Sequence, residues 1–268
     1  MMTGTSEIRW IDEYLFDDDA SRARFRSEIA GIYRPHLRRL GTTFKDGEHD
    51  DTQSMRMRLL GFFARTLEDA DVRKMLAVQG DAVLGLGDDR SKLDTLPRDL
   101  RGLAIVVAVQ DHGKPAFEAV ERQLRGQPDA ELRWDLLFAL GSTRDPRLAE
   151  RARQLLLEPD FLRKGEISWV LDMQATIPAG RKALRQWIDL NFDALKTKLA
   201  PVDARLVKAY AAGMCSRGDI DELQRKFGLR VKTMEGGALT LQQLSESIRL
   251  CEAKLAVRRG QVPALAAP

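Results

Sequence analysis

Residues 178–195 read PAGRKALRQWIDLNFDAL, and this stretch decides the fold class. A proline and a glycine near its start are typical of the entry into a helix. Large apolar side chains then recur at helical spacing: Leu184, Trp187, Ile188 and Leu195. The pair Asn191-Phe192 lies between two turns of this pattern. The stretch therefore predicts an amphipathic helix that buries one face.

The same helical period extends along the whole chain. We expect helices at residues 7–16, 21–40, 52–68, 71–84, 98–110, 115–125, 130–140, 146–157, 165–176, 179–198, 203–213, 218–227 and 238–258. Glycines and prolines separate them, as expected for helices joined by short turns. The β-branched run at residues 103–109 would also suit a buried strand, but it has no partner run of similar character. We therefore predict a helix there too, and a kink or division at Pro35.

Polar, turn-forming breaks recur before amphipathic helices at residues 69–74, 112–117 and 143–148. Helix pairs that bury their faces only against neighbouring pairs are typical of α-solenoids. We therefore predict an all-α, HEAT/armadillo-like α-solenoid, a right-handed superhelix of antiparallel helix pairs. We expect a single domain over residues 7–258, with flexible termini at residues 1–6 and 259–268.

The composition predicts a chain with a sizeable core and a mixed surface charge. Apolar residues make up 44% of the 268 residues, and 43 basic and 40 acidic residues give a net charge of +3. We expect the arginine-rich residues 22–39 to pair with neighbouring acids, which argues against a nucleic-acid ligand. No apolar run approaches the ~20 residues of a membrane helix. Because the N-terminus also lacks the apolar stretch of a secretory signal, we expect no membrane partner and a cytoplasmic location by default.

The two cysteines, Cys215 and Cys251, cannot form a disulfide framework of the kind found in small secreted proteins. Each lies among helical residues. We expect each to pack as a small apolar group.

The proline-glycine start, Trp187 and Asn191-Phe192, followed by residues 214–217 (MCSR), resemble one family segment. That segment is the C-terminal helical domain of M1 zinc aminopeptidases, the class that includes the endoplasmic-reticulum and puromycin-sensitive enzymes. Phe44 stands where the family has a tryptophan. The resemblance covers roughly residues 7–258. Other motifs follow in the family's order at residues 37–41 (LRRLG), 47–48 (GE), 56–60 (RMRLL), 97–101 (PRDLR) and 236–250.

The resemblance implies a domain without the family's chemistry. M1 aminopeptidases bind zinc through a His-Glu-x-x-His helix, whose glutamate activates water. This chain has three histidines, His36, His49 and His112, none with that spacing, and it lacks the Gly-Ala-Met-Glu-Asn exopeptidase motif. We therefore expect no peptidase activity and no cofactor in this chain alone. Zinc is expected only in a separate M1 catalytic module.

The resemblance also implies that the domain forms the wall of the substrate chamber and binds the distal part of peptide substrates. The expected partners are an M1 catalytic module, in cis or in trans, and peptides. Arginine and tyrosine side chains can bind a carboxylate through charge-assisted hydrogen bonds. We expect the peptide-binding residues on the first helix and at the ends of later helices: Tyr14, Arg133, Trp134 and Arg144.

Other interpretations of these residues stay open. Helical spacing also predicts core positions for Trp134, Trp169 and Trp187, and each arginine also suits an ordinary charged surface. The alternative function is a free-standing helical-repeat scaffold that binds another protein. A HEAT-like nucleic-acid binder is a further alternative, based on the arginines of residues 22–39.

Overall fold

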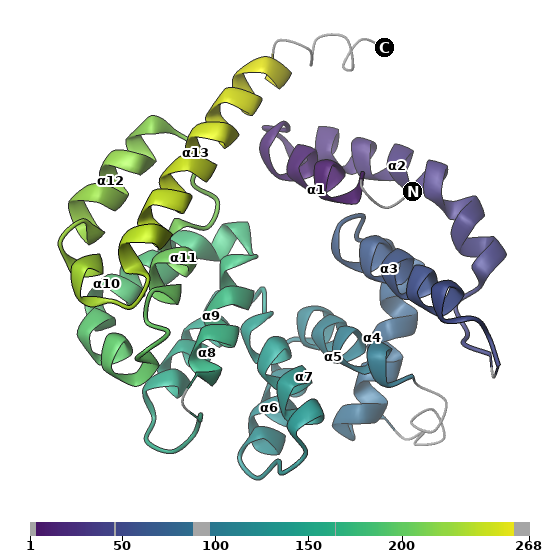
Figure 1. The fold of residues 1–268 in the computed structure, drawn as a ribbon. Coiled ribbons are helices and arrows are strands. Elements are labelled where there is room, and N and C mark those ends of the chain that lie inside the picture. Colours follow the sequence, from purple (N-terminus) through teal and green to yellow (C-terminus); the bar gives the residue numbers. More distant parts are fainter. Residues whose placement is uncertain (1–3, 46, 88–96, 164, 260–268) are drawn as a thin grey trace. The chain divides into compact units, whose positions relative to one another are not determined.

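The computed structural model of the chain describes residues 4–45, 47–87, 97–163 and 165–259. These residues form thirteen α-helices and short 3-10 helices, with no strand among them (Figure 1). The prediction of an all-α helical-repeat fold is thus confirmed. The chain divides into two compact units, residues 1–107 with 255–268 and residues 108–254.

In the first unit, helices that are neighbours in sequence pack against one another around an apolar core. Within it, α2 packs on α1 and α3, and α3 packs on α4. Leu60, Phe63 and Leu76 are fully buried at its centre. Its helices are α1 (Thr5–Tyr14), α2 (Asp19–Leu40), α3 (Asp50–Arg65), α4 (Ala70–Leu84) and the first part of α5 (Arg98–His112).

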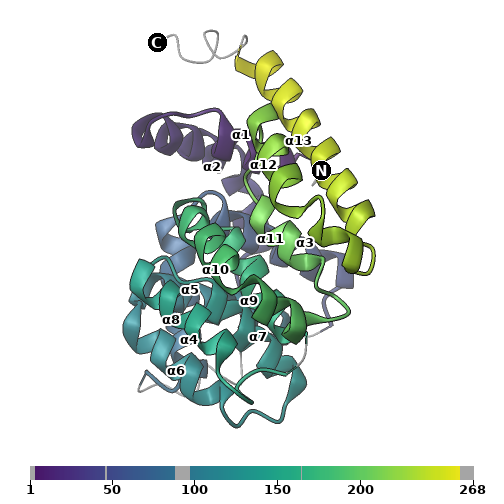
Figure 2. The same ribbon diagram turned by 90° about the vertical axis from the view of Figure 1, so that its left-hand side faces the viewer.

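The second unit is made of helix pairs. Helices α7, α9 and α11 lie side by side in one layer, and α6, α8 and α10 pack on them (Figures 1 and 2). Its elements are the rest of α5, α6 (Lys114–Leu124), α7 (Ala130–Gly141), α8 (Pro146–Leu157), α9 (Glu166–Ala175), η2 (Pro178–Gly180), α10 (Arg181–Leu199), α11 (Arg205–Ala211), α12 (Arg217–Phe227), η3 (Arg230–Thr233) and most of α13 (Gly237–Arg259). The right-handed superhelix stays a prediction.

The stretch at residues 178–195 forms η2 and most of α10. Its backbone leaves helical geometry at Asn191, where φ is −115° and ψ is 15°. The Asn191 side chain donates a hydrogen bond of 2.9 Å to the carbonyl of Trp187, which satisfies an acceptor at the kink. Ile188 is buried, as predicted, and Phe192 is buried too, whereas Trp187 is only partly buried.

The predicted breaks are helix starts with side-chain caps. Asp69 accepts a hydrogen bond from the backbone N–H of Val72, and Asp145 caps α8 in the same way. Ser216 caps α12 in a capping box, a pattern that satisfies the free N–H groups of a helix start. Pro35 lies inside α2 without dividing it.

The β-branched run at residues 103–109 is helical, as predicted. It lies within α5, and each of its side chains is buried. A helix that is apolar on all sides is expected where it is covered on all sides.

The prediction for the cysteines was wrong, because Cys215 and Cys251 form a disulfide with a Cα–Cα distance of 5.2 Å. Cys215 lies just before α12 and Cys251 lies within α13. The two are 36 residues apart in sequence, so local helical spacing could not reveal their contact. Disulfides persist mainly in oxidising compartments, which does not favour the cytoplasmic location that we expected by default.

The ends of the chain differ in part from the expectation. Thr5 and Ser6 belong to α1, and Arg259 ends α13, while residues 1–3 and 260–268 lie outside the described residues. The single domain over residues 7–258 stays a prediction. None of the described helices is long and apolar enough to cross a lipid bilayer.

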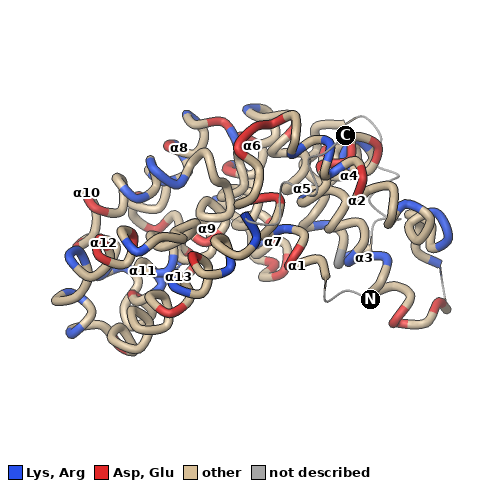
Figure 3. The backbone as a smooth tube through the Cα atoms, turned by 90° about the horizontal axis from the view of Figure 1, so that it is seen from above, with Lys and Arg blue, Asp and Glu red and all other residues tan. Residues whose placement is uncertain are grey.

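Basic and acidic residues are interspersed along the helices (Figure 3). In the arginine-rich part of α2, Arg22 pairs with Asp19 at 2.6 Å, and Arg26 pairs with Asp12 at 2.7 Å. Arg34 pairs with Asp69. These pairs match the expectation of intrachain pairing for this segment. A nucleic-acid phosphate would have to displace an existing carboxylate from each of these three arginines.

Candidate functional site

An aromatic cluster lies on the layer formed by α7 and α9 in the second unit. Its members are Trp134 and Phe138, one turn apart on α7, and Trp169 on α9. The ring centroids of Trp134 and Trp169 are 4.1 Å apart, and those of Trp134 and Phe138 are 5.2 Å apart in a stacked arrangement. Trp134 is 44% exposed, whereas Phe138 and Trp169 are half-buried, so the Trp134 ring is the part of the cluster that faces solvent. Exposed aromatic surface of this kind is typical of binding sites.

A cation lies at the edge of this cluster. The Arg205 guanidinium of α11 sits over the Trp169 ring at 4.8 Å from the centroid, within cation–π range. It also donates a hydrogen bond of 3.2 Å to the hydroxyl of Ser168 and lies 3.6 Å from the Asp172 carboxylate. Burial raises the pKa of Asp172, although the charges of Arg205 and Lys208 oppose this shift. The site thus combines aromatic surface with one partly exposed ion pair.

Close packing of α7 on α9 places the two tryptophans in contact. A Cβ atom at Gly141 would lie 2.6 Å from the carbonyl oxygen of Val170 and 2.7 Å from Cβ of Met173. Only glycine allows this approach without a shift of the backbone. The glycine that ends α7 therefore helps to set the spacing of the cluster.

Arg133, predicted as a peptide-binding residue, is a buried crosslink in the structure. It is 6% exposed, and its Nε and Nη2 donate to the Glu166 carboxylate at 2.6 and 2.7 Å. Its Nη1 and Nη2 also donate to the carbonyls of Leu124 and Phe161 at 2.7 and 3.2 Å. The side chain ties α7 to the end of α6 and the start of α9.

The other predicted site residues lie apart from the aromatic cluster. Arg144 is exposed on the turn between α7 and α8. Trp134 lies about two helical turns before the end of α7, so the structure does not bring Arg144 and Trp134 together. Tyr14 belongs to the first unit, where its ring stacks on Trp10 with centroids 5.4 Å apart. Peptide binding by these residues stays a prediction.

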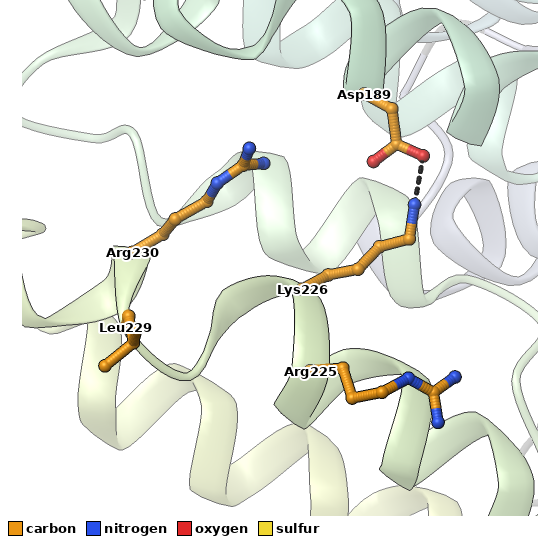
Figure 4. A pocket seen from close by; sticks show the side chains of 5 residues that line it. All are labelled: Asp189, Arg225, Lys226, Leu229 and Arg230. Atoms are coloured by element: carbon orange, nitrogen blue, oxygen red, sulfur yellow. Dashed lines mark hydrogen bonds and ion pairs between the residues drawn. The ribbon is translucent and has the colours of Figure 1, made fainter.

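Apart from the aromatic cluster, a pocket of about 520 Å³ lies at the end of α12, and basic side chains line it (Figure 4). Lys226 pairs there with Asp189, as the dashed line in Figure 4 shows. Arg230 sits over the Phe192 ring at 4.3 Å from the centroid, while Arg225 and Leu229 are exposed. The pocket lacks a buried polar group that would orient a ligand, so it is a weaker candidate than the aromatic cluster.

Four contributors to the site were not predicted from the sequence. Phe138 was not singled out, Trp169 was expected in the core, and Arg205 and Asp172 were not considered. The spacing of four residues between Trp134 and Phe138 predicts that they share a helix face. Spacing alone does not show whether that face is buried, because exposure depends on which helices pack around it.

Each of the three histidines lies on or caps a different helix. His36 lies on α2, His49 caps α3, and His112 lies in the last turn of α5. In the part of the chain that the structure describes, no group of three or more His, Cys, Asp or Glu side chains could hold a metal ion.

Comparison with known proteins supports the family that is indicated by the order of the sequence motifs along the chain. The family model for the ERAP1-like C-terminal domain matches residues 2–250, which is nearly the whole chain. No curated protein matches the chain. The resemblance to the C-terminal helical domain of these aminopeptidases, based on the segments around Trp187 and Ser216, is thus confirmed at the level of the domain family. The chain belongs to the family of ERAP1-like C-terminal domains.

Proposed function

We propose that the chain is a non-catalytic C-terminal domain of an M1-family metallo-aminopeptidase and binds the distal part of peptide substrates on its aromatic cluster. The domain family supports the link to the aminopeptidases. The contact of Trp134 with Phe138 and Trp169, in which the Trp134 ring is 44% exposed, is the observation that carries the binding role. In this proposal the domain forms part of the wall of the substrate chamber.

The chemistry of the cluster suits the end of a peptide. An apolar side chain of the peptide packs on the rings of Trp134 and Phe138, which bury apolar area at little entropic cost because the rings already stack. The peptide carboxylate then approaches Arg205, whose side chain is 37% exposed and whose pairing with Asp172 is long, at 3.6 Å. A charge-assisted hydrogen bond to a carboxylate is stronger than this loose pair.

Catalysis belongs to another module in this proposal. The chain has no pair of histidines at the spacing that zinc needs, so zinc and the water that it activates are supplied by a separate M1 catalytic module, in cis or in trans. The role of this chain is to position the far end of the peptide. Such positioning acts through binding geometry and not through bond-making groups.

Peptide titration tests the binding role. A short peptide ending in leucine, as the free acid and as the C-terminal amide, is titrated while tryptophan fluorescence is followed. Truncation of a central tryptophan typically costs about 2 kcal/mol, so Trp134→Ala is expected to weaken binding roughly thirtyfold. Leu190→Ala is the matched control, because Leu190 is 85% exposed on α10, a helix that carries no residue of the cluster. Equal affinities of the two variants would refute the role of the cluster.

Mixing experiments test the link to a catalytic module. The chain is added to an M1 catalytic module encoded in the same genome, and hydrolysis is measured for peptides of increasing length. We expect association and a changed length preference. Absence of both effects contradicts this part of the proposal while leaving peptide binding by the isolated chain to be judged by the titration.

A further inference from the structure

The pocket at the end of α12 carries more positive charge than its acidic residue matches. Its lining residues are Asp189, Arg225, Lys226, Leu229 and Arg230. Asp189 is the acid among them, and it pairs with Lys226 (Figure 4). Neither Arg225 nor Arg230 forms an ion pair with any residue that the structure describes. Two guanidinium groups of this hollow are therefore available to anions from outside the chain.

The basic character of this segment exceeds what a helix end requires. Residues 225–233 read RKFGLRVKT and contain four basic side chains and no acid. Arg225 and Lys226 lie in the last turn of α12, where a cation is favourable because the helix dipole is negative there. That effect is confined to the last turn. Arg230 and Lys232 lie beyond it, in η3, so the helix dipole does not account for them.

An apolar side chain stands in the middle of this basic segment. Leu229 is 79% exposed, whereas Phe227 and Val231 on either side of it are buried. The two buried neighbours anchor the turn between α12 and η3, and Leu229 is left on its outer side. A partner that covers Leu229 would remove apolar surface from water, which is favourable. The surface thus offers an apolar anchor between positive charges.

The arrangement of the arginines suits several separated anions and not one small anion. In Figure 4 the guanidinium groups of Arg225 and Arg230 lie on opposite sides of the Lys226 side chain. Arg230 is positioned by its contact with the Phe192 ring, at 4.3 Å from the centroid. A small ligand would also lack the buried polar group that orients it in a pocket. A chain that crosses the pocket can instead be held at each cation in turn.

We propose that this pocket binds an acidic segment of a partner protein, in which acidic side chains flank an apolar one. The carboxylates pair with Arg225 and Arg230, and the apolar side chain packs on Leu229. Opposite charge selects such a partner. A hollow of about 520 Å³ accommodates an inserted segment, whereas a flat lipid surface would cover only its rim. None of these residues belongs to the aromatic cluster, so the inference does not depend on the proposed function.

A labelled acidic peptide tests the proposal. Fluorescein-labelled Glu-Asp-Leu-Asp-Glu is titrated with the full chain at low salt, and fluorescence anisotropy is followed. We expect saturable binding that weakens as sodium chloride is raised, because salt screens exposed charges. The variant Arg225→Gln/Arg230→Gln should bind the peptide roughly tenfold more weakly, since two exposed ion pairs are lost and each contributes little. Absence of saturable binding up to about 0.5 mM chain overturns the proposal.

The matched control is Arg217→Gln/Arg249→Gln, which lowers the net charge of the chain by the same amount. Both residues are exposed, Arg217 at the start of α12 and Arg249 on α13, and neither lines the pocket. The control should bind the peptide as the unmodified chain does, and circular dichroism checks that both double variants fold. Equal affinities of the two double variants overturn the proposal, because binding would then follow net charge alone.

Changes in the peptide separate the role of charge from that of the apolar anchor. Leu229→Ser should weaken binding of the leucine peptide but not of Glu-Asp-Ser-Asp-Glu, since the serine peptide has no apolar side chain to pack on Leu229. The uncharged peptide Gln-Asn-Leu-Asn-Gln should not bind. If the uncharged peptide binds as tightly as the acidic one, the assignment of an acidic partner is wrong.

Two other occupants of the pocket are distinguished by further measurements. A second copy of the chain offers its own acidic residues 12–19, DEYLFDDD. Concentration-dependent self-association that is lost in Arg225→Gln/Arg230→Gln overturns the proposal in favour of a second copy. Cosedimentation with phosphatidylserine vesicles that is lost in the same variant, without binding of the peptide, overturns it in favour of a lipid surface. We expect neither result.

Discussion

Replacing Arg133 with methionine is expected to destabilise the second unit by about 3 kcal/mol. Methionine keeps the apolar stem but removes all four hydrogen bonds of the guanidinium, two to Glu166 and one each to the carbonyls of Leu124 and Phe161. Removing one partner of a buried ion pair typically costs about 3–5 kcal/mol, because the other charge stays buried. We expect the lower end, because the Glu166 side chain is 14% exposed and keeps the N–H of Arg163 at 2.7 Å.

A double-mutant cycle measures the pair itself. Glu166→Gln is expected to cost about 2 kcal/mol, because it removes the charge but keeps one acceptor for Arg133. The double variant should cost less than the sum of the two single variants, with a coupling energy above about 1 kcal/mol. Chemical denaturation followed by circular dichroism gives these free energies. A coupling energy below about 0.5 kcal/mol, within the additivity of independent sites, would refute the structural role that we assign to Arg133.

The stability that the Glu166 carboxylate contributes should depend on pH. Burial raises the pKa of Glu166, but its hydrogen bonds from Arg133 and from the Arg163 N–H outweigh this, so the pKa lies below its usual value. A carboxyl whose pKa is lower in the folded state contributes stability above its unfolded pKa of about 4.3. That contribution is lost as the pH falls through the folded value. The stability difference between the native chain and Glu166→Gln should therefore shrink below about pH 4.

The remaining predictions concern the second unit as well. Reduction of the Cys215–Cys251 disulfide should lower the free energy of unfolding by about 2–4 kcal/mol, because the bond closes a 36-residue span; a free-thiol assay on the denatured, unreduced chain should find none. Burial and the hydrogen bond to Glu222 raise the pKa of Tyr210 to about 12. Spectrophotometric titration of Tyr210→Phe should therefore lack one phenol that ionises near that pH in the unmodified chain. Arg153 on α8 is 6% exposed and forms no ion pair with a described acidic side chain, so Arg153→Met should raise stability by about 1 kcal/mol, measured by denaturation; lower stability would contradict an uncompensated charge.

Local sequence signals account for most of the fold. Helix periodicity, the turn-forming polar segments and the separating glycines and prolines predicted every α-helix of the described residues, with α8 at its observed bounds. These signals suffice because a helix forms its hydrogen bonds within one segment, and its ends are marked by residues nearby in sequence.

Long-range contacts set the limit of that prediction. The disulfide joins Cys215 to Cys251 across 36 residues, and no local pattern encodes it. The exposure of Trp134 depends on how α7, α9 and α11 pack. Helical spacing identified Trp134 as an apolar position of α7, but the same spacing is compatible with a core or a binding surface. The candidate site could therefore be named only in part from the sequence.

Neighbouring residues of one helix show why sequence adjacency is a poor guide to a site. Arg133 and Trp134 were grouped because they adjoin, yet successive helical residues point about 100° apart. Arg133 is 6% exposed and Trp134 is 44% exposed, so one faces the interior and the other faces solvent. A peptide that packs on Trp134 has no access to the guanidinium of Arg133. The effect of Arg133 on peptide binding should therefore arise only through the position of α7.

Arg133 and Arg153 then show that burial alone does not identify a binding residue. Both are 6% exposed, and both lie on helices of the same unit, Arg133 in the first turn of α7 and Arg153 in the middle of α8. The donors of Arg133 are matched by a carboxylate and two carbonyls, so further binding would cost existing bonds. Arg153 has one amide acceptor, and its Nε has no hydrogen-bond partner although it is shielded from solvent. The state of the donors, and not burial, therefore separates a fully bonded crosslink from an arginine that keeps an unmatched donor.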